Sequence, residues 1–440
     1  MAIQQISSVD SGSVAAGKIN SNFGEVTQQV DELSQQVDEL SQQGGGSDQP
    51  SVGILSRNQD AIARVYATKK YVHEVSDGGG QWDRQNNDGL FCIAHGTDFH
   101  ADDIALKNFL DFVGGVSGIN ASVITGDFVC VEKNTFSAEA AVIKGVLDAH
   151  TVKSMLGVGN HERWSGLSMA DITSALGFAD NVTSGVIGNV GQGYYYKDFT
   201  TSNTNTGVQQ QKIRVIMLNQ LDHPSSNTKA NAAKVGTFSS TQISFFLNAL
   251  DGAISGGYAV LVAMHCPESG PTIKGDDNPF YQSVDRWNKL IETGSGTIIE
   301  DIIAAFRSGG SINKTYTFNN GAASVTVNHN FSGSGHFIAY MVGHTHVDRI
   351  GYSPVHPDQL YLMCASSCCM SNEASQQTHS WSGEISDLPR VRGTKTEDCF
   401  NVYGIDTIHK TVRVARVGAD VNNLMEKREM ACFEYQPAMS

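Results

Sequence analysis

Hydrophobic residues in the first fifty positions recur at the spacing typical of a coiled coil. They are separated alternately by four and three residues, which is the a/d pattern of a helix that packs against partner helices. The stripe consists of Ile19, Phe23, Val26, Val30, Leu33, Val37 and Leu40. Because about three heptads make only a marginal helix in isolation, residues 19–40 predict a homo-oligomeric stalk. The alternative is an amphipathic helix that packs on its own domain.

A glycine-rich segment separates this stripe from the rest of the chain. GGGS stands at 44–47, and such a composition is typical of a flexible linker. Val at a and Leu at d favour two strands, whereas the Ser and Gln residues at e and g do not fix the number of partners by charge. The chain is therefore divided into an oligomerising segment at 1–43, a linker at 44–51 and one globular domain at 52–440.

The globular part alternates between apolar runs and helical periodicity. The apolar runs predict strands at 90–95, 121–126, 154–158, 213–218, 258–264 and 336–342. The periodicity predicts helices at 58–75, 101–114, 137–150, 239–252 and 296–307. The segment 399–417 alternates and breaks around Asp406–Lys410, as a hairpin does. This order indicates an α/β fold with a mainly parallel sheet, whose ligand-binding loops follow the carboxyl ends of the strands.

Charge and composition narrow the class of partner. The 30 Lys+Arg and 45 Asp+Glu residues give a net charge of −15, and charged residues make up only 17% of the chain. A broad basic face for long nucleic acid is not expected, nor is a highly charged disordered chain.

The sequence also shows no segment typical of membrane insertion or export. No apolar stretch reaches the roughly 20 residues that span a bilayer, and the first residues lack the features of a secretory signal. The 8 cysteines form no CxxC pair, so buried thiols are expected.

Five short polar clusters follow predicted strands, and together they indicate a metal site. In chain order they are Asp98-Phe99-His100, Gly126-Asp127, Gly159-Asn160-His161-Glu162, His265 and Gly343-His344-Thr345-His346. The DxH and HxH spacings place two side chains on the same side of an extended segment. Carboxylates and imidazoles are ligands of divalent transition metals. The Gly-, Ser- and Asn-rich segment 309–335, which leads into the last cluster, is expected to be a loop at the rim of this site.

With these clusters the chain resembles the calcineurin-like metallophosphoesterases, whose pattern is DxH, GDxx, GNH[DE], H and GHxH. The resemblance covers roughly residues 88–350 and implies a β-sandwich flanked by helices with two divalent metal ions. Mn, Fe, Zn and Ni all suit these ligands. The resemblance assigns the first metal to Asp98, His100 and His346, the second to Asn160, His265 and His344, and the bridging position to Asp127.

The residues around this ligand set carry further expectations. By the same resemblance, His161 contacts the substrate phosphate and protonates the leaving oxygen. Glu162 either orients His161 or pairs with Arg163 or a backbone amide. His95, at the end of the first strand, is a structural residue or approaches the site. One departure concerns Cys130, which stands where the family often has Asp or Asn and which puts a hydrogen bond to the bridging ligand in doubt.

Two divalent cations that share a water lower its pKa and neutralise phosphate oxygens. The chemistry implied is hydrolysis of a phosphodiester or phosphomonoester by in-line attack of a metal-bridging hydroxide, with Asp127 and His161 as catalytic residues. Such cations would also explain how an acidic chain binds a phosphate ester.

The segment AAGKINSNFGEV (15–26) resembles the start of bacteriophage tail and fibre proteins, where similar sequences begin a trimeric stalk. This resemblance implies a virion protein, favours a trimer over a dimer, makes other phage tail proteins candidate partners and places the substrate on a host surface. One alternative is a virion structural or receptor-binding protein that uses the fold for adhesion with little or no hydrolysis. Another is a phosphatase or nuclease in the bacterial cytoplasm.

Overall fold

The computed structural model describes most of the globular part of the chain. The described residues are 53–62, 65, 90–130, 135–201, 210–222, 238–269, 297–318, 323–344, 346, 349–369, 390–419 and 431–435. The predicted stalk at 19–40, the linker at 44–51 and the phage-like segment at 15–26 lie outside them. Within the described ranges, no helix has both the length and the apolar character needed to cross a membrane.

The first of two large sheets has six strands and mixed direction. Its order is β15 (Ala431–Glu434), β14 (Thr411–Gly418), β13 (Cys399–Asp406), β1 (Phe91–Gly96), β2 (Ala121–Ile124) and β3 (Met155–Leu156). Strands β1, β2 and β3 are parallel. Strand β13 pairs antiparallel with β1, so that Ile93 lies opposite Tyr403, and with β14, which confirms the predicted hairpin.

The second large sheet has seven strands. Its order is β11 (Arg349–Tyr352), β12 (Leu360–Met363), β10 (His336–Val342), β7 (Ala259–Ala263), β6 (Lys212–Met217), β5 (Tyr194–Thr200) and β4 (Ile187–Asn189). The four central strands, β12, β10, β7 and β6, are parallel to one another. The strands that flank them pair in antiparallel fashion. The prediction of a mainly parallel sheet was therefore wrong at both edges of this sheet and on the β13–β14–β15 side of the first sheet.

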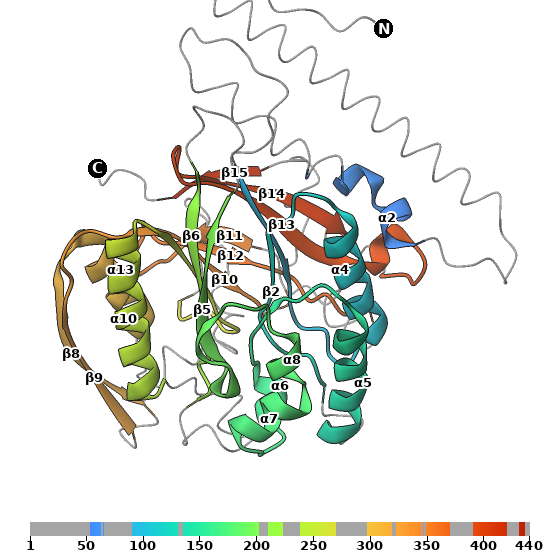
Figure 1. Cartoon of the computed structure of the whole chain (residues 1–440), viewed down its shortest axis with the longest axis horizontal. Helices are drawn as coiled ribbons and strands as arrows, with labels where there is room; N and C mark the ends of the chain where they lie inside the picture. The colour runs from blue at the N-terminus through green and yellow to red at the C-terminus, as the bar shows by residue number, and fades with distance from the viewer. Residues whose placement is uncertain are drawn as a thin grey trace, which may run out of the picture.

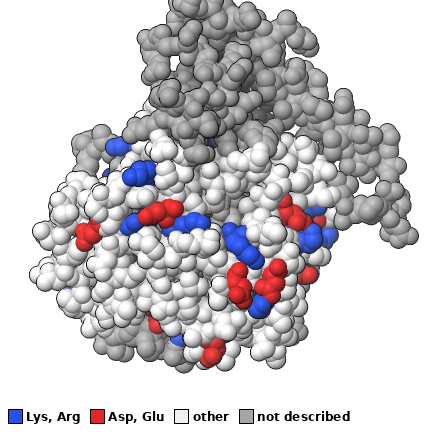
Figure 2. Space-filling view, in the orientation of Figure 1, with Lys and Arg blue, Asp and Glu red and all other residues white. Residues whose placement is uncertain are grey.

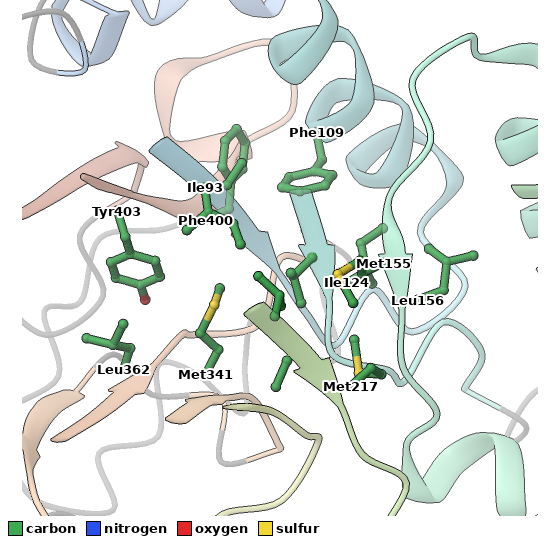
Figure 3. Packing of buried hydrophobic residues seen from close by; sticks show 14 of the residues in the cluster. Ile93, Phe109, Ile124, Met155, Leu156, Met217, Met341, Leu362, Phe400 and Tyr403 are labelled. Atoms are coloured by element: carbon green, nitrogen blue, oxygen red, sulfur yellow. The ribbon is translucent and has the colours of Figure 1, made fainter. Parts of the chain in front are cut away.

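The two sheets face each other across one hydrophobic core. Ile93 and Tyr403 of the first sheet and Met217, Met341 and Leu362 of the second belong to the same buried cluster. Figure 3 shows these side chains between the strands of the two sheets. A fully buried residue of this size stabilises the fold by about 1.5–3 kcal/mol, so this core holds the two sheets together.

The continuous apolar runs in the central strands arise because both faces of the second sheet are covered. Along β7, Leu261 points into the core between the sheets, and its neighbours Val260 and Val262 belong to a second buried cluster. That cluster includes residues of α10 (Ser240–Gly256) and α13 (Ile298–Ser308). Successive side chains of a strand point to opposite faces, and here each face meets apolar partners.

Helices cover the outer faces of both sheets (Figure 1). On the first sheet, Phe400 of β13 packs edge-on against Phe109 and Phe112 of α4 (Asp103–Gly115). Helix α5 (Phe136–Ala149) lies beside α4, and α2 (Ile54–Arg57) also contacts α4. Helix α10 is capped at its N-terminus by Ser239, whose hydroxyl accepts from the Gln242 amide, and at its C-terminus by Gly257, which has φ 66°; both residues are typical of helix caps.

Shorter elements complete the chain. Three short helices follow β3, and two 3₁₀ turns precede β5 and β13. They are α6 (Asn160–Arg163), α7 (Met169–Ala175), α8 (Phe178–Asn181), η2 (Val190–Gln192) and η5 (Lys395–Glu397). Much of 309–335, which was predicted to be a loop, forms the hairpin of β8 (Ser311–Phe318) and β9 (Ala323–Asn330). That prediction was wrong because the hairpin alternates: Tyr316 and Val325 point into the core with α10 and α13.

The α/β class is thus confirmed, as two mixed sheets with helices outside them. On the face drawn in Figure 2, charged side chains are few, and blue and red ones lie in mixed groups. This sparse distribution agrees with the low charged fraction of the sequence. Most of the described surface in that view is neutral.

Because the ring centroids of Phe109 and Phe112 lie 5.1 and 5.2 Å from that of Phe400, the variant Phe400→Ala leaves a cavity between α4 and the first sheet. We expect its free energy of unfolding to fall by about 3–5 kcal/mol, measured by urea denaturation. The matched control is Ile408→Ala, since Ile408 is 44% exposed in the β13–β14 turn. A Phe400→Ala variant as stable as this control would contradict the packing described.

Candidate metal centre

The polar clusters predicted from the sequence lie at one end of the sandwich. Asp98 follows β1, Asp127 follows β2 and Asn160 follows β3, all in the first sheet. His265 follows β7 and His344 follows β10, in the second sheet. Parallel strands end at the same edge of a sheet, and the core between the sheets brings the two edges together. The ligand set is therefore divided between both sheets.

The backbone at this end has an uncommon conformation. Seven non-glycine residues in the described part of the chain have positive φ, and five of them belong to the clusters: Asp98, His100, Asp127, His344 and His346, with φ between 48° and 68°. Such a conformation costs an L residue roughly 1–2 kcal/mol. Residues held this way cluster at functional sites, where the surrounding structure compensates for the strain.

Two glycines of the clusters are required by close packing. A Cβ at Gly159 would lie 2.1 Å from Asp127 Oδ1, and a Cβ at Gly343 would lie 2.5 Å from Asp98 Oδ2. Neither distance is compatible with a side chain. The GNHE and GHTH clusters therefore begin with glycine because their backbones press directly on the two aspartates.

A first group of donors consists of Asp98, His100 and His346. The Nε2 atoms of the two histidines lie 3.0 Å apart. Asp98 Oδ1 lies 3.2 Å from Nε2 of His346 and 3.8 Å from Nε2 of His100. Asp98 and His100 are buried. Three ligand atoms about 2.1 Å from a shared cation lie about 3.0–3.4 Å apart, so this triangle is close to the size that a cation requires.

A second group consists of Asp127, Asn160 and His265. Nε2 of His265 lies 3.2 Å from Asp127 Oδ2 and 3.0 Å from Asn160 Oδ1. Nδ1 of His265 contacts the carbonyl oxygen of Thr125 at 3.0 Å. Because a carbonyl oxygen only accepts hydrogen bonds, Nδ1 carries hydrogen. Nε2 is therefore the nitrogen that faces the side-chain oxygens of Asp127 and Asn160 and that could bind a cation with them.

The donor atoms of the two groups are close to each other. One donor atom each from Asp98, Asp127 and His265 lie within 4.8 Å of one another. His344 is linked to both groups: its amide donates to Asp98 Oδ2 at 2.9 Å, and its ring centroid lies 5.1 Å from that of His265. The structure therefore brings together all seven residues that the sequence predicted as ligands.

The donor set fits a cation better than it fits an empty polar pocket. Asp98 Oδ1 and His100 Nδ1 are buried and have no hydrogen-bond partner of acceptable geometry in the described structure. A buried carboxylate oxygen without a donor is costly. A divalent cation would satisfy Asp98 Oδ1, and the carboxylate, amide and imidazole donors have the chemistry that such cations bind.

The charges of the site are strongly coupled. Burial alone would raise the pKa of the Asp98 and Asp127 carboxyls, but the facing histidines, His265 first among them, hold both well below their usual range. Burial opposes a proton on His265, yet Asp127 and Asp98 raise its pKa to about 9. Burial, followed by the charge of His265, lowers the pKa of His344 to about 3. The proton on His265 thus supplies positive charge to Asp127 and Asp98, which is the charge that a bound cation would supply instead.

His161 lies next to the ligand set. Its Nδ1 contacts the carbonyl oxygen of Cys130 at 2.8 Å, and its Nε2 lies 3.9 Å from Asp127 Oδ2. The ring packs between His100, at 4.5 Å between centroids, and Trp164, at 3.9 Å. Burial opposes protonation of His161, but Asp127 and the Cys130 carbonyl raise its pKa.

Glu162 joins two of the clusters through the backbone. Its carboxylate accepts from the amides of Asp127 at 3.0 Å, Val129 at 3.0 Å and Gly159 at 2.7 Å. Burial, and then Asp127, raise the pKa of Glu162 to about 7. Of the roles that the sequence left open, the contacts correspond to pairing with backbone amides. Glu162 is linked to His161 through Asp127: the Asp127 amide donates to Glu162, and Asp127 Oδ1 accepts from the His161 amide.

His95 lies behind the ligands, in the core. It is fully buried, and its Nε2 contacts Thr125 Oγ1 at 3.0 Å. The carbonyl of the same Thr125 holds His265, so His95 is two contacts away from a proposed ligand. Burial lowers the pKa of His95 to about 3, which makes it a neutral residue of the core.

Sequence reasoning missed the segment that supports Asp98 from the side. Ser366 Oγ donates to the Asp98 carbonyl at 2.7 Å, and the Ser367 amide donates to the Thr97 carbonyl at 2.9 Å. Arg390 donates to the carbonyls of Ser366 and Ser367. The signal that could have revealed it is the run of small residues directly after LYLM at 360–363, which is another strand end of the second sheet.

Comparison with known proteins yields similarity to solved structures alone. No protein-family model matches the chain, and neither does any curated protein sequence. A dimetal phosphatase from Danio rerio is 12% identical, with a TM-score of 0.44, and the match covers 79% of this chain and 100% of that one. A protein from Thermus thermophilus is 8% identical, with a TM-score of 0.35 and coverage of 74% and 99%. A predicted phosphoesterase from Streptococcus pneumoniae is 11% identical, with a TM-score of 0.25 and coverage of 78% and 97%. Similarities this low carry no argument about the activity of this chain or about the roles of its residues.

Cation binding should depend on pH through His265. Its pKa of about 9 lies above neutrality, so a bound cation must displace a proton from Nε2. We expect Mn²⁺ affinity to rise by about tenfold per pH unit from pH 6.5 towards 9, as one proton is released. Isothermal titration in two buffers of different ionisation enthalpy measures that proton. Affinity that is flat over this range would contradict the role of His265.

Glu162→Gln should weaken the junction between the GD and GNHE clusters. A glutamine offers one oxygen instead of two, so at least one amide loses its acceptor, which costs about 1–3 kcal/mol of unfolding free energy. The displacement of Asp127 should reduce Mn²⁺ affinity by about tenfold or more. The matched control is Glu139→Gln, since Glu139 is also buried but accepts from the Cys130 amide. If both variants bind Mn²⁺ equally well, Glu162 does not position Asp127.

Proposed function

We propose that this chain is a metal-dependent phosphoesterase of the calcineurin-like kind, which hydrolyses a phosphate ester at a centre of two divalent cations. The observation that supports this most directly is the position of Asp127. Its carboxylate is buried, faces His265 of the second donor group at 3.2 Å, and has a donor atom within 4.8 Å of one from Asp98 of the first group. One carboxylate between two donor groups is the arrangement that a pair of cations requires.

The proposed assignment of ligands follows the two donor groups. Asp98, His100 and His346 would hold one cation, Asn160, His265 and His344 the other, and Asp127 both. When bound, such cations supply the positive charge that a phosphate ester needs and an activated water as the nucleophile. The net charge of −15 is then no obstacle, since bound cations would supply positive charge at the site.

His161 is the proposed proton donor to the leaving oxygen. Its Nδ1 already donates to the Cys130 carbonyl, so the exchangeable proton is on Nε2. Asp127 favours the protonated form of the ring. The packing of the ring against Trp164 and His100 limits its rotation and keeps Nε2 near Asp127, where the reacting phosphate would lie. A histidine in this state is a suitable general acid near neutral pH.

The decisive assay uses the full chain loaded with Mn²⁺. We expect hydrolysis of bis-p-nitrophenyl phosphate or p-nitrophenyl phosphate, and loss of both bound cation and activity in Asp127→Asn. His161→Gln should keep its cations and lose about 10²–10⁴-fold in turnover. The control is His329→Gln, a histidine of β9 that pairs with Asp251 at 3.0 Å. A chain that holds two cations and hydrolyses neither ester would contradict the proposal.

The leaving group distinguishes a proton donor from a merely structural histidine. An ester whose leaving alcohol is a weak acid needs protonation more than one that releases p-nitrophenol. The rate loss in His161→Gln should therefore grow as the pKa of the leaving alcohol rises. A loss that is the same for every leaving group would show that His161 only supports the fold.

A virion location, a trimeric stalk and action on a host surface component are part of the same proposal. The a/d stripe at 19–40 and the KIN–NF segment at 15–26 support them, and both lie outside the described residues. The mass of the full chain in solution measures the oligomer directly. A monomer would contradict the stalk and would leave the hydrolytic proposal standing.

A further inference from the structure

We infer that Cys130, together with His100 and His161, forms a binding site for a thiophilic divalent cation such as Cd²⁺ or Zn²⁺. One ligand atom from each of these three residues lies within 4.8 Å of the other two. This set differs from both donor groups described above, because it contains a thiol and because it uses His161, which is not among the proposed ligands of the catalytic cations.

The backbone of Cys130 is fixed at both ends. Its amide donates to the Glu139 carboxylate at 2.6 Å, and its carbonyl accepts from His161 Nδ1 at 2.8 Å. The Cys130 sulfur lies within 4.8 Å of a ring nitrogen of His161. That ring meets the ring of His100 edge-on, with centroids 4.5 Å apart and planes at 80°. The thiol and the two imidazoles therefore converge without any rearrangement of the main chain.

A second observation concerns the ring of His100. Nδ1 of His100 has no hydrogen-bond partner in the described structure, and His100 is 2% exposed. A buried ring nitrogen without a partner is costly. Coordination is one way to satisfy it, because neutral imidazole binds cations through either nitrogen.

The size of the trio suits Zn²⁺ or Cd²⁺ after a small closure. Zinc bonds of about 2.3 Å to sulfur and about 2.0–2.1 Å to nitrogen place the donors about 3.5 Å apart. The side chains must therefore approach by about an ångström. His161 is partly exposed and can move most easily. On binding, the thiol releases its proton to solvent and the sulfur becomes the thiolate ligand.

The thiol selects the class of cation. Thiolate and imidazole favour soft and borderline ions, whereas Mn²⁺ and Mg²⁺ favour oxygen donors. The family that the chain resembles often has a carboxylate or amide side chain at the position of Cys130. The thiol therefore shifts the preference of this position from cations that favour oxygen ligands to thiophilic cations. A cation held here engages both His161 and His100, so it inhibits hydrolysis at the proposed centre; this last consequence rests on the proposed function.

A second thiol provides the internal comparison. Cys266 also lies within 4.8 Å of two histidines, His265 and His344. Both of those rings belong to the proposed catalytic ligand set, and the Cys266 amide and carbonyl are bound by Gln220. His161 lies outside that set, so the Cys130 trio retains a histidine that no catalytic cation occupies. We therefore assign the thiophilic site to Cys130.

The test is a Cd²⁺ titration of the full chain, followed by the thiolate-to-cadmium charge-transfer absorbance in the ultraviolet. We expect the band in the wild type and in Cys266→Ser, and its loss in Cys130→Ser and Cys130→Ala. Cys92→Ala is the control for a buried thiol away from the site, in β1. Circular dichroism confirms that each variant is folded. A band that survives in Cys130→Ala, or that is absent from the wild type, overturns the assignment.

A second arm measures inhibition of the Mn²⁺-loaded chain by Cd²⁺. We expect the inhibitory Cd²⁺ concentration, measured for each protein against its own rate without Cd²⁺, to rise by about tenfold or more in Cys130→Ser. Equal sensitivity of the two proteins would refute the inhibitory consequence. The absorbance arm needs no hydrolysis, so it remains decisive for the cation site even if the proposed activity fails.

Discussion

Two carboxylates buried at the seam between the sheets impose the constraint on which the rest of this structure depends. Asp98 and Asp127 are almost completely buried, and an ion removed from water costs several kcal/mol unless other groups compensate. Hydroxyl and amide groups from several segments of the chain provide this compensation. Thr97 and the His344 amide donate to Asp98, and the His161 amide donates to Asp127. The folded chain must bring all of these groups to one point.

That requirement explains the local backbone of the site. Donors reach the carboxylates only because the segments after the strands turn sharply, with positive φ at both aspartates. The glycines at 159 and 343 let two further segments press on the same carboxylates. Glu162 adds another layer, since its own buried carboxylate fixes the amides that surround Asp127. Strain, close packing and charge are thus consequences of one need, which is to keep two acids ionised inside the protein.

The sequence predicted much of this architecture for identifiable reasons. Central strands such as β7 have apolar residues on both faces, and helices such as α10 show helical periodicity, so both kinds of element were located closely. The edge strands were missed or misjudged. β8 and β9 contain many polar residues because only one face is covered, and a strand such as β4 has only three residues. Antiparallel pairing at the edges depends on where the chain returns, which local pattern does not encode.

The candidate site was predictable to the extent that its residues carry rare side chains in short motifs. Asp98, Asp127, His265 and the other predicted ligands lie close together because each follows a strand that ends at the same end of the sandwich. The supporting groups were harder to find. Ser366 supports Asp98 through an ordinary hydroxyl, and His95 reaches His265 through Thr125. Such contacts depend on distances between segments far apart in the chain, and no spacing along the sequence expresses them.

The placement of β13 beside β1 has a consequence for how the protein is made. Strand β1 is synthesised long before β13, the partner that covers its other edge. Asp98 and Asp127 likewise emerge long before His344 and His346. Until the segment with His344 and His346 is present, these acids lack part of the groups that compensate for their burial, and a folding chain with such distant contacts is slow to close. The complete ligand cluster therefore cannot form in the nascent chain before the segment that carries His344 and His346 has been synthesised.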